Sequence, residues 1–233
     1  MTDDVPRVAT FDCYGTLVDW EGGLGSFLYA LALELDDPAP GENGEAMRSR
    51  WEAIQFKLIQ GPYRIYKEVL AESLRRWMDE RGYPWRPERG EALVRAMRSW
   101  QPFPDTIPAL RQARAGGLQL AILSNTDRDI IAQTLRQLEV PFDAVVTAED
   151  VGVYKPSLAN FERLLETVGE PPERVLHVAF GFKYDIGPAA GLGMQTAWVN
   201  RRAESTPAGA TPDLVWRDLW GLAALAGGPG PGF

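Results

Sequence analysis

The stretch ATFDCYGTLVDW, residues 9–20, lies almost at the start of the chain. It begins inside the short apolar run RVATF, residues 7–11, which is typical of a buried strand. That strand ends on a carboxylate, Asp12, and the pair Gly15-Thr16 follows shortly after it. Because parallel α/β sheets bind ligands at the carboxyl ends of their strands, the stretch predicts a functional carboxylate at such an edge.

Strand-like and helix-like segments alternate along the chain after Pro104. The predicted strands are residues 118–124, 144–147, 174–179, 195–199 and 214–216, and the predicted helices are residues 107–115, 128–138, 158–168 and 185–192, with one more after the last strand. Strands that alternate with helices are joined by right-handed crossovers and form a parallel sheet. The alternation therefore predicts a Rossmann-like α/β core.

The segment from about residue 22 to residue 98 has a different pattern, because its apolar residues recur at helical spacing. The spacing is clearest at Leu24, Phe27, Leu28, Leu31 and Leu35, and again at Trp51, Ile54, Leu58 and Ile59. Two further helices are predicted over residues 65–78 and 88–100, and the Pro- and Gly-rich residues 36–44 form a connection.

The chain is therefore predicted to consist of a core and an inserted cap. The core comprises residues 1–18 and 104–226, the helical cap residues 19–103, and the Gly/Pro-rich residues 227–233 a flexible tail. The predicted fold class is α/β, a Rossmann-like parallel sheet with an inserted α-helical bundle. Helices inserted just past a strand's carboxyl end lie over the ligand-binding edge, so the cap is a natural lid.

Composition and charge narrow the range of partners. The chain has 233 residues, with 32 acidic and 24 basic side chains and a formal net charge of −8. An acidic chain without a basic stripe does not favour nucleic acid or an anionic membrane. The single cysteine, Cys13, excludes an internal disulfide framework and a cysteine-based zinc site. With no signal segment or membrane-spanning run, we expect a cytoplasmic protein, and a homodimer stays open.

Polar side chains follow four of the predicted strands and converge at one crevice if the sheet is parallel. They are Asp12 and Thr16, Ser124 and Asn125, Lys155, and Asp185. In such a site Asp12 is a nucleophile that forms an ester, and Lys155 keeps it ionised. Asp185 positions Lys155 or binds water. The hydroxyl and amide groups donate hydrogen bonds to the substrate or to a carboxylate.

Four motifs in the sequence resemble those of the haloacid dehalogenase-like hydrolase superfamily. They are FDCYGTLVD, ILSN, YKP and HVAFGFKYDIGPAAGLGM, in family order, with a helical cap after the first. The resemblance covers nearly the whole chain. It implies a nucleophilic Asp12, a Ser/Thr at Ser124, a lysine at Lys155 and an acid at Asp185.

Two departures separate the chain from the magnesium-dependent phosphatases that make up most of this superfamily. Tyr14 stands where phosphatases carry a second aspartate, and Ala179-Phe180 replaces the Gly-Asp pair whose acid binds magnesium. Magnesium binds weakly without such carboxylates, so we expect no metal and no cofactor. The 2-haloacid dehalogenase branch carries a tyrosine at this position, so the chain resembles that branch at Tyr14.

The match to that branch has gaps. Its members carry an arginine after the cap tryptophan, a serine and an asparagine in the fourth motif, and a tyrosine six residues past the lysine. This chain has Glu52 after Trp51, Phe180 and Phe182 in the fourth motif, and Phe161 past the lysine. Another cap arginine could take over substrate binding, and the candidates are Arg48, Arg50 and Arg64.

Each candidate has a plainer interpretation. Ser124 and Asn125 could cap the following helix, Asp185 could be a helix N-cap, and Lys155 could be a solvated loop residue. His177 is interpreted as a satisfied core residue, and nothing near Cys13 suggests an activated thiolate.

The sequence favours a hydrolase that acts at carbon through an aspartyl ester, on a small carboxylic acid such as a 2-halocarboxylate. The side chains expected to line its pocket are Tyr14, Trp20, Phe180 and Phe182. Two alternatives stay open, a phosphatase-like hydrolase and a non-catalytic binding descendant of the fold.

Overall fold

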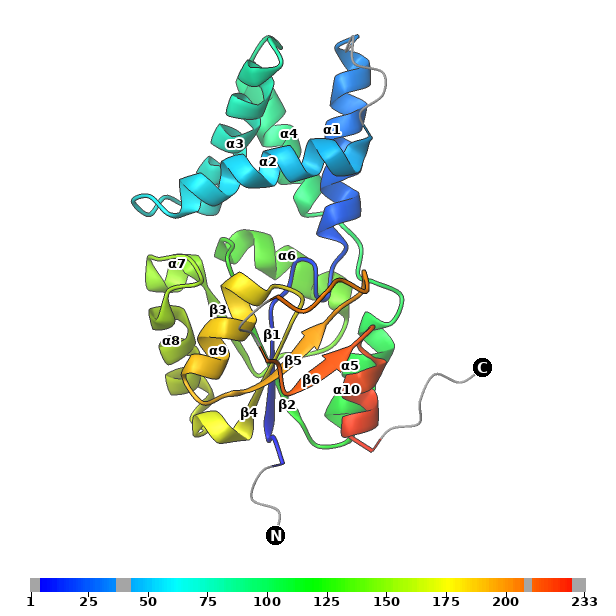
Figure 1. The fold of residues 1–233 in the computed structure, drawn as a ribbon, viewed down its shortest axis with the longest axis vertical. Helices are drawn as coiled ribbons and strands as arrows, with labels where there is room; N and C mark the ends of the chain where they lie inside the picture. Colours follow the sequence, from blue (N-terminus) through cyan, green and yellow to red (C-terminus); the bar gives the residue numbers. More distant parts are fainter. Residues whose placement is uncertain (1–4, 37–42, 208–210, 228–233) are drawn as a thin grey trace.

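The protein contains one parallel sheet whose strand order is β3-β2-β1-β4-β5-β6 (Figure 1). The computed structural model describes residues 5–36, 43–207 and 211–227. The strands are β1 Val8–Phe11, β2 Gln119–Ser124, β3 Ala144–Thr147, β4 Val175–Ala179, β5 Gln195–Val199 and β6 Leu214–Trp216. All neighbouring strands pair in parallel, which confirms the predicted α/β fold with a Rossmann-like sheet.

Helices cover both faces of the sheet, because both faces of its central strands are apolar. On one face, Phe11 and Ile122 pack in the cluster that contains Leu110, Ile130 and Leu222. On the other, alternate strand residues pack with α8 and α9. The core helices are α5 Thr106–Ala115, α6 Arg128–Leu138, α7 Ala148–Val151, α8 Leu158–Val168, α9 Gly187–Gly191 and α10 Trp220–Leu225.

Two features of the core depart from the sequence prediction. The helix predicted from Asp185 is divided into a π-helical turn, Phe182–Ile186, and the short α9. The four-residue α7 was not predicted, although its capping box is visible in the sequence as Thr147 followed by Asp150. Apart from Gly227, the predicted tail lies outside the described residues, as do residues 37–42 of the predicted connection.

Between β1 and α5, the described chain forms helices joined by loops and adds no strand to the sheet. The helices are α1 Trp20–Glu34, α2 Gly44–Ile59, α3 Tyr66–Glu80 and α4 Pro87–Met97. In Figure 1 they stand together beyond one edge of the sheet, and their packing buries side chains such as Trp51, Trp77 and Leu74. The division of the chain at residues 18 and 103 stays a proposal. No helix among the described residues is both long and apolar enough to cross a membrane.

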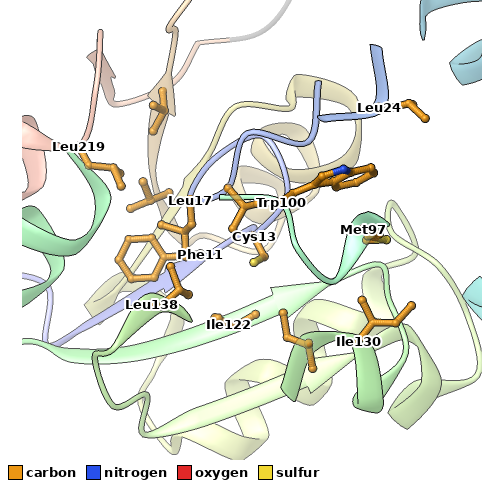
Figure 2. Packing of buried hydrophobic residues seen from close by; sticks show 14 of the residues in the cluster. Phe11, Cys13, Leu17, Leu24, Met97, Trp100, Ile122, Ile130, Leu138 and Leu219 are labelled. Carbon is orange, nitrogen blue, oxygen red and sulfur yellow. The ribbon is translucent and has the colours of Figure 1, made fainter. Parts of the chain in front are cut away.

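The two chain segments that join the helices to the sheet lie side by side. The Asp19 amide donates to the Gln101 carbonyl at 3.0 Å, and the Phe103 amide donates to the Leu17 carbonyl at 3.1 Å. Figure 2 shows the apolar side chains around these two segments. Trp100 and Leu17 pack there in the same cluster as Phe11. The apolar core therefore continues from the sheet into the cap.

A buried carboxylate of the core also contacts the cap. Asp127, at the start of α6, accepts hydrogen bonds from the backbone amides of Tyr66 at 2.7 Å and Lys67 at 2.9 Å. These amides open α3, whose own N-cap residue, Ile65, makes no side-chain cap. Because the first amides of a helix have no partner within it, Asp127 supplies the missing acceptor from the core. The cap and core are thereby docked at a fixed position.

We expect Asp127→Ala to loosen this docking. The loss of a helix-capping acceptor costs about 1 kcal/mol of folding stability and speeds hydrogen exchange at the Tyr66 and Lys67 amides. Asn43→Ala is the matched control, because Asn43 Oδ1 caps α2 at the Ala46 amide, 3.0 Å away, without any core contact. Amide exchange measured by NMR distinguishes the two variants. Unchanged exchange at Tyr66 and Lys67 in Asp127→Ala would contradict the docking role.

Candidate active site

Asp12 lies at the centre of the sheet, directly after β1. Strand β1 is flanked by β2 and β4, so Asp12 sits at the point where the strand order reverses, a place where such sheets bind ligands. Asp12 is buried, with its side chain 10% exposed. Thr16 Oγ1 donates to Asp12 Oδ2 at 3.0 Å and accepts from the Phe180 amide at 3.0 Å. Thr16 therefore links the turn after β1 to the turn after β4.

Gly15 allows this turn to form. Its φ is +102°, a backbone conformation that favours glycine. A Cβ atom at this position would lie 2.5 Å from the Phe180 ring. The absence of a side chain at Gly15 thus lets Phe180 pack against the turn after β1.

Lys155 lies between the two carboxylates. Its Nζ is 2.9 Å from Asp12 Oδ1 and 2.6 Å from Asp185 Oδ1, and it also donates to the Leu123 carbonyl at 3.0 Å. The side chain is 2% exposed. An ammonium group has three protons, and these three acceptors use all of them. Lys155 is therefore a buried structural and electrostatic centre of the site, and the plainer interpretation of a solvated loop lysine is wrong.

Asn125 holds the Lys155 backbone. Its Oδ1 accepts from the Lys155 amide at 2.7 Å, and its Nδ2 donates to the Lys155 carbonyl at 3.1 Å. Its amide is therefore directed to Lys155. The Ser124 hydroxyl is buried and has no hydrogen-bond partner among the described residues. It faces a cavity that also borders Asp12. A buried hydroxyl without a partner is costly, which is consistent with the predicted role of Ser124 as a hydrogen-bond donor to the substrate.

The charges of the cluster set the pKa values of its members. Burial raises the pKa of Asp12, and Asp185 adds to this, while Lys155 and Thr16 oppose it. Burial alone would lower the pKa of Lys155, but Asp12 and Asp185 hold it above the usual value. Burial alone would raise the pKa of Asp185, but Lys155 and His177 together hold it below the usual value. The two carboxylates are thus different, and Asp12 is the more basic of them.

His177 is the residue that the sequence analysis placed in the core without a role at the site. It is fully buried, as expected, but its Nε2 lies 3.1 Å from Asp185 Oδ1 and its Nδ1 lies 2.8 Å from Thr10 Oγ1. When the Thr10 hydroxyl donates to Nδ1, the Nε2 proton is directed to Asp185. Thr10 and His177 are register partners on β1 and β4, and this pair of polar residues on two central strands was the available signal.

A small cavity of about 90 Å³ opens above Asp12. From the core it is lined by Asp12, Tyr14, Ser124, Asn125, Lys155, Phe180, Tyr184 and Asp185, and from the cap side by Trp20, Gln55, Ile59, Tyr66, Met97 and Trp100. The predicted pocket residues Tyr14, Trp20 and Phe180 thus lie together around Asp12. Phe182 does not line this cavity, because the π-helical turn directs it toward Trp198, with ring centroids 4.5 Å apart.

The residues at this edge do not fit a magnesium ion. A lysine ammonium occupies the space between Asp12 and Asp185 where a cation would lie. Tyr14 cannot replace the missing acid, because burial raises the pKa of its hydroxyl well above the usual range and the hydroxyl is hydrogen-bonded to Thr134 Oγ1 at 2.8 Å. Within the described residues, no group of three or more acidic, histidine or cysteine side chains could hold a metal.

None of the three candidate cap arginines reaches the described lining of the small cavity. Arg48 is buried in ion pairs with Glu21, at 3.0 Å, and with Glu52. Arg50 pairs with Glu80 on the surface. Arg64 is exposed, and its carbonyl accepts from the Tyr154 hydroxyl. Phe161, the other departure from the dehalogenase pattern, packs in the core with its ring 5.4 Å from that of His177.

Comparison with known proteins agrees with this architecture. The model of the haloacid dehalogenase-like hydrolase family matches residues 6–193. The chain is 30% identical over 217 residues to the (S)-2-haloacid dehalogenase H-109 of Pseudomonas putida, covering 90% of this chain and 92% of that protein. It is 31% identical over 183 residues to the phosphoserine phosphatase of Thermus thermophilus, covering 75% and 71%. The crystal structure of an L-2-haloacid dehalogenase matches with a TM-score of 0.82 and 26% identity, covering 95% and 99%.

The molecule is thus an α/β hydrolase with a helical insertion over the carboxyl edge of its sheet. The matched range begins before β1 and ends after α9, so it includes the four strand ends that meet at Asp12. On this basis the chain belongs to the haloacid dehalogenase-like hydrolase family.

Replacement of Lys155 by methionine keeps the length of the stem and removes the charge. We expect turnover to fall by about a hundredfold or more, because a preorganised charge next to the reacting group is lost. Asp12 must be ionised to react, so activity is present above its pKa and lost below it. Because Lys155 lowers that pKa, its removal should shift the acidic limb of the pH–rate profile to higher pH.

Lys155→Arg should rescue turnover only in part, because a planar guanidinium does not match the three acceptors around a compact ammonium. Lys57→Met on the exposed face of α2 is the matched control. Loss of a buried ion pair also costs about 3–5 kcal/mol, so stability is checked by thermal unfolding, and adding Asp185→Asn should restore folding without restoring turnover. Near-wild-type turnover in Lys155→Met would show that the cluster is not the reaction centre.

Proposed function

We propose that this enzyme hydrolyses a carbon–halogen bond in a small 2-halocarboxylic acid, through an ester between the substrate carbon and Asp12. The observation that carries the proposal is the small cavity itself. A carboxylate whose pKa is raised by burial faces aromatic side chains, and the charged groups beside it among the described lining residues are Lys155 and Asp185. Such a site suits displacement at carbon, because it offers a nucleophile without a metal to activate a phosphoryl group. The haloacid dehalogenases among its relatives support the same reaction.

In the first half of the reaction, an oxygen of Asp12 attacks the carbon that bears the halogen. A carbon–oxygen bond forms, the carbon–halogen bond breaks, and the halide leaves with the electron pair. Lys155 and Thr16 orient the carboxylate through their bonds to Oδ1 and Oδ2, respectively. The free hydroxyl of Ser124 binds the substrate carboxylate or the leaving halide.

In the second half, water attacks the carbonyl carbon of the Asp12 ester, which releases the 2-hydroxy acid and regenerates the carboxylate. Asp185 is placed to orient this water. Both of its hydrogen bonds, from Lys155 and His177, use Oδ1, and its Oδ2 has no partner among the described residues. Asp185 also lines the cavity. One proton of the water ends on the hydroxyl group of the product, and the other is released. Together with the halide that left in the first half, the released proton makes up the net acid product.

A phosphatase is the second candidate, because the phosphoserine phosphatase of Thermus thermophilus is 31% identical over 183 residues, against 30% over 217 residues for the dehalogenase. Release of halide, release of phosphate or neither separates the dehalogenase, the phosphatase and a binding protein without catalysis. The proposal also includes a cytoplasmic location. The buried free thiol of Cys13, whose pKa is raised by burial, suits a reducing compartment.

The decisive comparison is a panel of 2-haloacids and phosphate esters, assayed with and without EDTA. We expect halide release from 2-chloropropionate at equal rates in both conditions, because the Lys155 ammonium already lies between the two carboxylates that a magnesium ion would bind. Added magnesium should not increase the rate. Phosphate release that requires magnesium would refute the dehalogenase and establish the phosphatase.

Asp12→Asn should remove nearly all halide release while the fold is retained, because the amide keeps the shape of the carboxylate and loses its nucleophilic charge. The matched control is Asp129→Asn, since Asp129 forms an ion pair with Lys67 outside the cavity. Ion chromatography measures the released halide, and circular dichroism monitors the fold. Halide release by Asp12→Asn at a substantial fraction of the wild-type rate would place the nucleophile elsewhere.

A further inference from the structure

A second cavity of about 680 Å³ lies beside the small one, between the cap and the core. On the cap side it is lined by residues of α1 and α2, and on the core side by the turns after β4 and β5. The two cavities share four lining side chains, which are Trp20, Gln55, Phe180 and Tyr184. A ligand that reaches both therefore passes between these cap and core side chains.

The sizes of the two cavities suit different parts of one substrate. Sites for small organic ligands usually span about 300–1,000 Å³. The cavity at Asp12, at about 90 Å³, is well below this range and admits only a few non-hydrogen atoms. The outer cavity lies within the range. A substrate larger than a simple haloacid would place its reactive carbon in the inner cavity and the rest of the molecule in the outer one.

The outer cavity is rich in aromatic side chains. Phe182 and Trp198 meet edge to face with ring centroids 4.5 Å apart, and Phe56 of the cap meets Tyr184 of the core at 5.6 Å. All four line the cavity. Aromatic walls of this kind pack well against a flat apolar group. They also account for Phe182, which the sequence analysis assigned to the pocket and which the structure places in this outer part.

Among the described residues that line the outer cavity, one cation has no acidic partner. Arg48 is paired with Glu21 and Glu52, Arg202 with Glu21 at 2.8 Å, and Arg201 with Asp105 at 2.9 Å. Lys183 differs, because its Nζ lies 3.5 Å from the centre of the Phe56 ring and has no acidic partner in the described part of the chain. It can therefore bind an anionic group without breaking an ion pair.

The inner cavity offers no such cation. The Lys155 ammonium is its only basic group among the described lining residues, and all three of its protons are bound. Asp12 and Asp185 together outweigh it by one negative charge. An anionic group some distance from the reactive carbon is therefore bound better in the outer cavity, at Lys183, than beside Asp12.

We propose that the outer cavity is a substrate subsite for the distal part of an extended 2-halo acid, an aromatic group that carries an anionic substituent held by Lys183. This inference rests on the proposed reaction at Asp12. The aromatic body lies among Phe56, Phe182 and Trp198, and the halogen-bearing carbon reaches Asp12 past Trp20 and Tyr184. The subsite is formed by cap and core together, so it exists only when the two are docked.

Three substrates test the length and the charge of the distal group. They are 2-chloropropionate, 2-chloro-3-phenylpropionate and 2-chloro-3-(4-carboxyphenyl)propionate. We expect kcat/KM to rise in that order, with about a tenfold gain from the distal carboxylate, as for a charge-assisted contact. Lys183→Met should abolish the preference for the carboxyphenyl compound over the phenyl compound, and Lys57→Met should keep it. Equal kcat/KM for the three acids, or a preference that survives in Lys183→Met, would overturn the subsite.

A binding measurement separates failure of the subsite from failure of the proposed reaction. The probe is 3-(4-carboxyphenyl)propionate, which has no halogen and cannot react. Isothermal titration calorimetry should give about tenfold weaker binding to Lys183→Met than to the wild type. If no haloacid is turned over but this difference is found, the subsite stands and the reaction is wrong. If haloacids are turned over and both proteins bind the probe equally, or do not bind it, the reaction stands and the subsite is wrong.

Discussion

The bond of the Lys155 ammonium to two buried carboxylates is the interaction on which the site depends. Asp12 and Asp185 come from turns after different strands, and the third acceptor is a carbonyl of β2. Buried like charges repel strongly, so without this cation one of the two carboxylates would be favoured to take up a proton. The same bonds fix the turns after β1, β3 and β4 relative to one another. A single side chain thus gives the sheet edge both its geometry and its charge.

This arrangement also bears on the reactivity proposed for Asp12. A cation that contacted only Asp12 would keep the pKa of the Asp12 carboxyl group low and make this carboxylate a weaker base. Here Lys155 is nearer to Asp185, which His177 also contacts, and burial leaves the pKa of Asp12 above its usual value. Phe180, packed on Gly15, closes one side of the cavity with an apolar ring. Asp12 is therefore poorly solvated, more basic than Asp185 and directed toward a small cavity.

The sequence was sufficient to predict the fold class, because strand–helix alternation and helical spacing are local patterns. The sequence also predicted that Asp12, Lys155 and Asp185 lie at one edge of the sheet, because they follow strands whose carboxyl ends meet at the same edge in a parallel sheet. Their catalytic roles stay predictions. The sequence could not predict how hydrogen bonds are distributed: Asn125 holds the Lys155 backbone, and His177 reaches Asp185 from inside the sheet. These contacts depend on register and side-chain rotamers, which no local pattern contains.

The cap was the least predictable part for the same reason. Helical spacing identified its helices, but not which faces meet the core. Arg48 was a candidate to bind substrate, but its guanidinium forms ion pairs with Glu21 and Glu52. Phe182 was assigned to the pocket at Asp12 and lies instead in the outer cavity, because a π-helical turn changes its direction. Contacts between segments far apart in sequence decide both outcomes.

The proposed ester between Asp12 and the substrate can be tested by isotope incorporation. A single turnover of excess enzyme with 2-chloropropionate in oxygen-18 water is followed by mass spectrometry of the peptide that contains Asp12. If water attacks the ester carbonyl, one heavy oxygen enters the Asp12 carboxylate and the product of that turnover carries none. Heavy oxygen in the 2-hydroxy acid, with an unlabelled Asp12, would show direct attack by water and contradict this account.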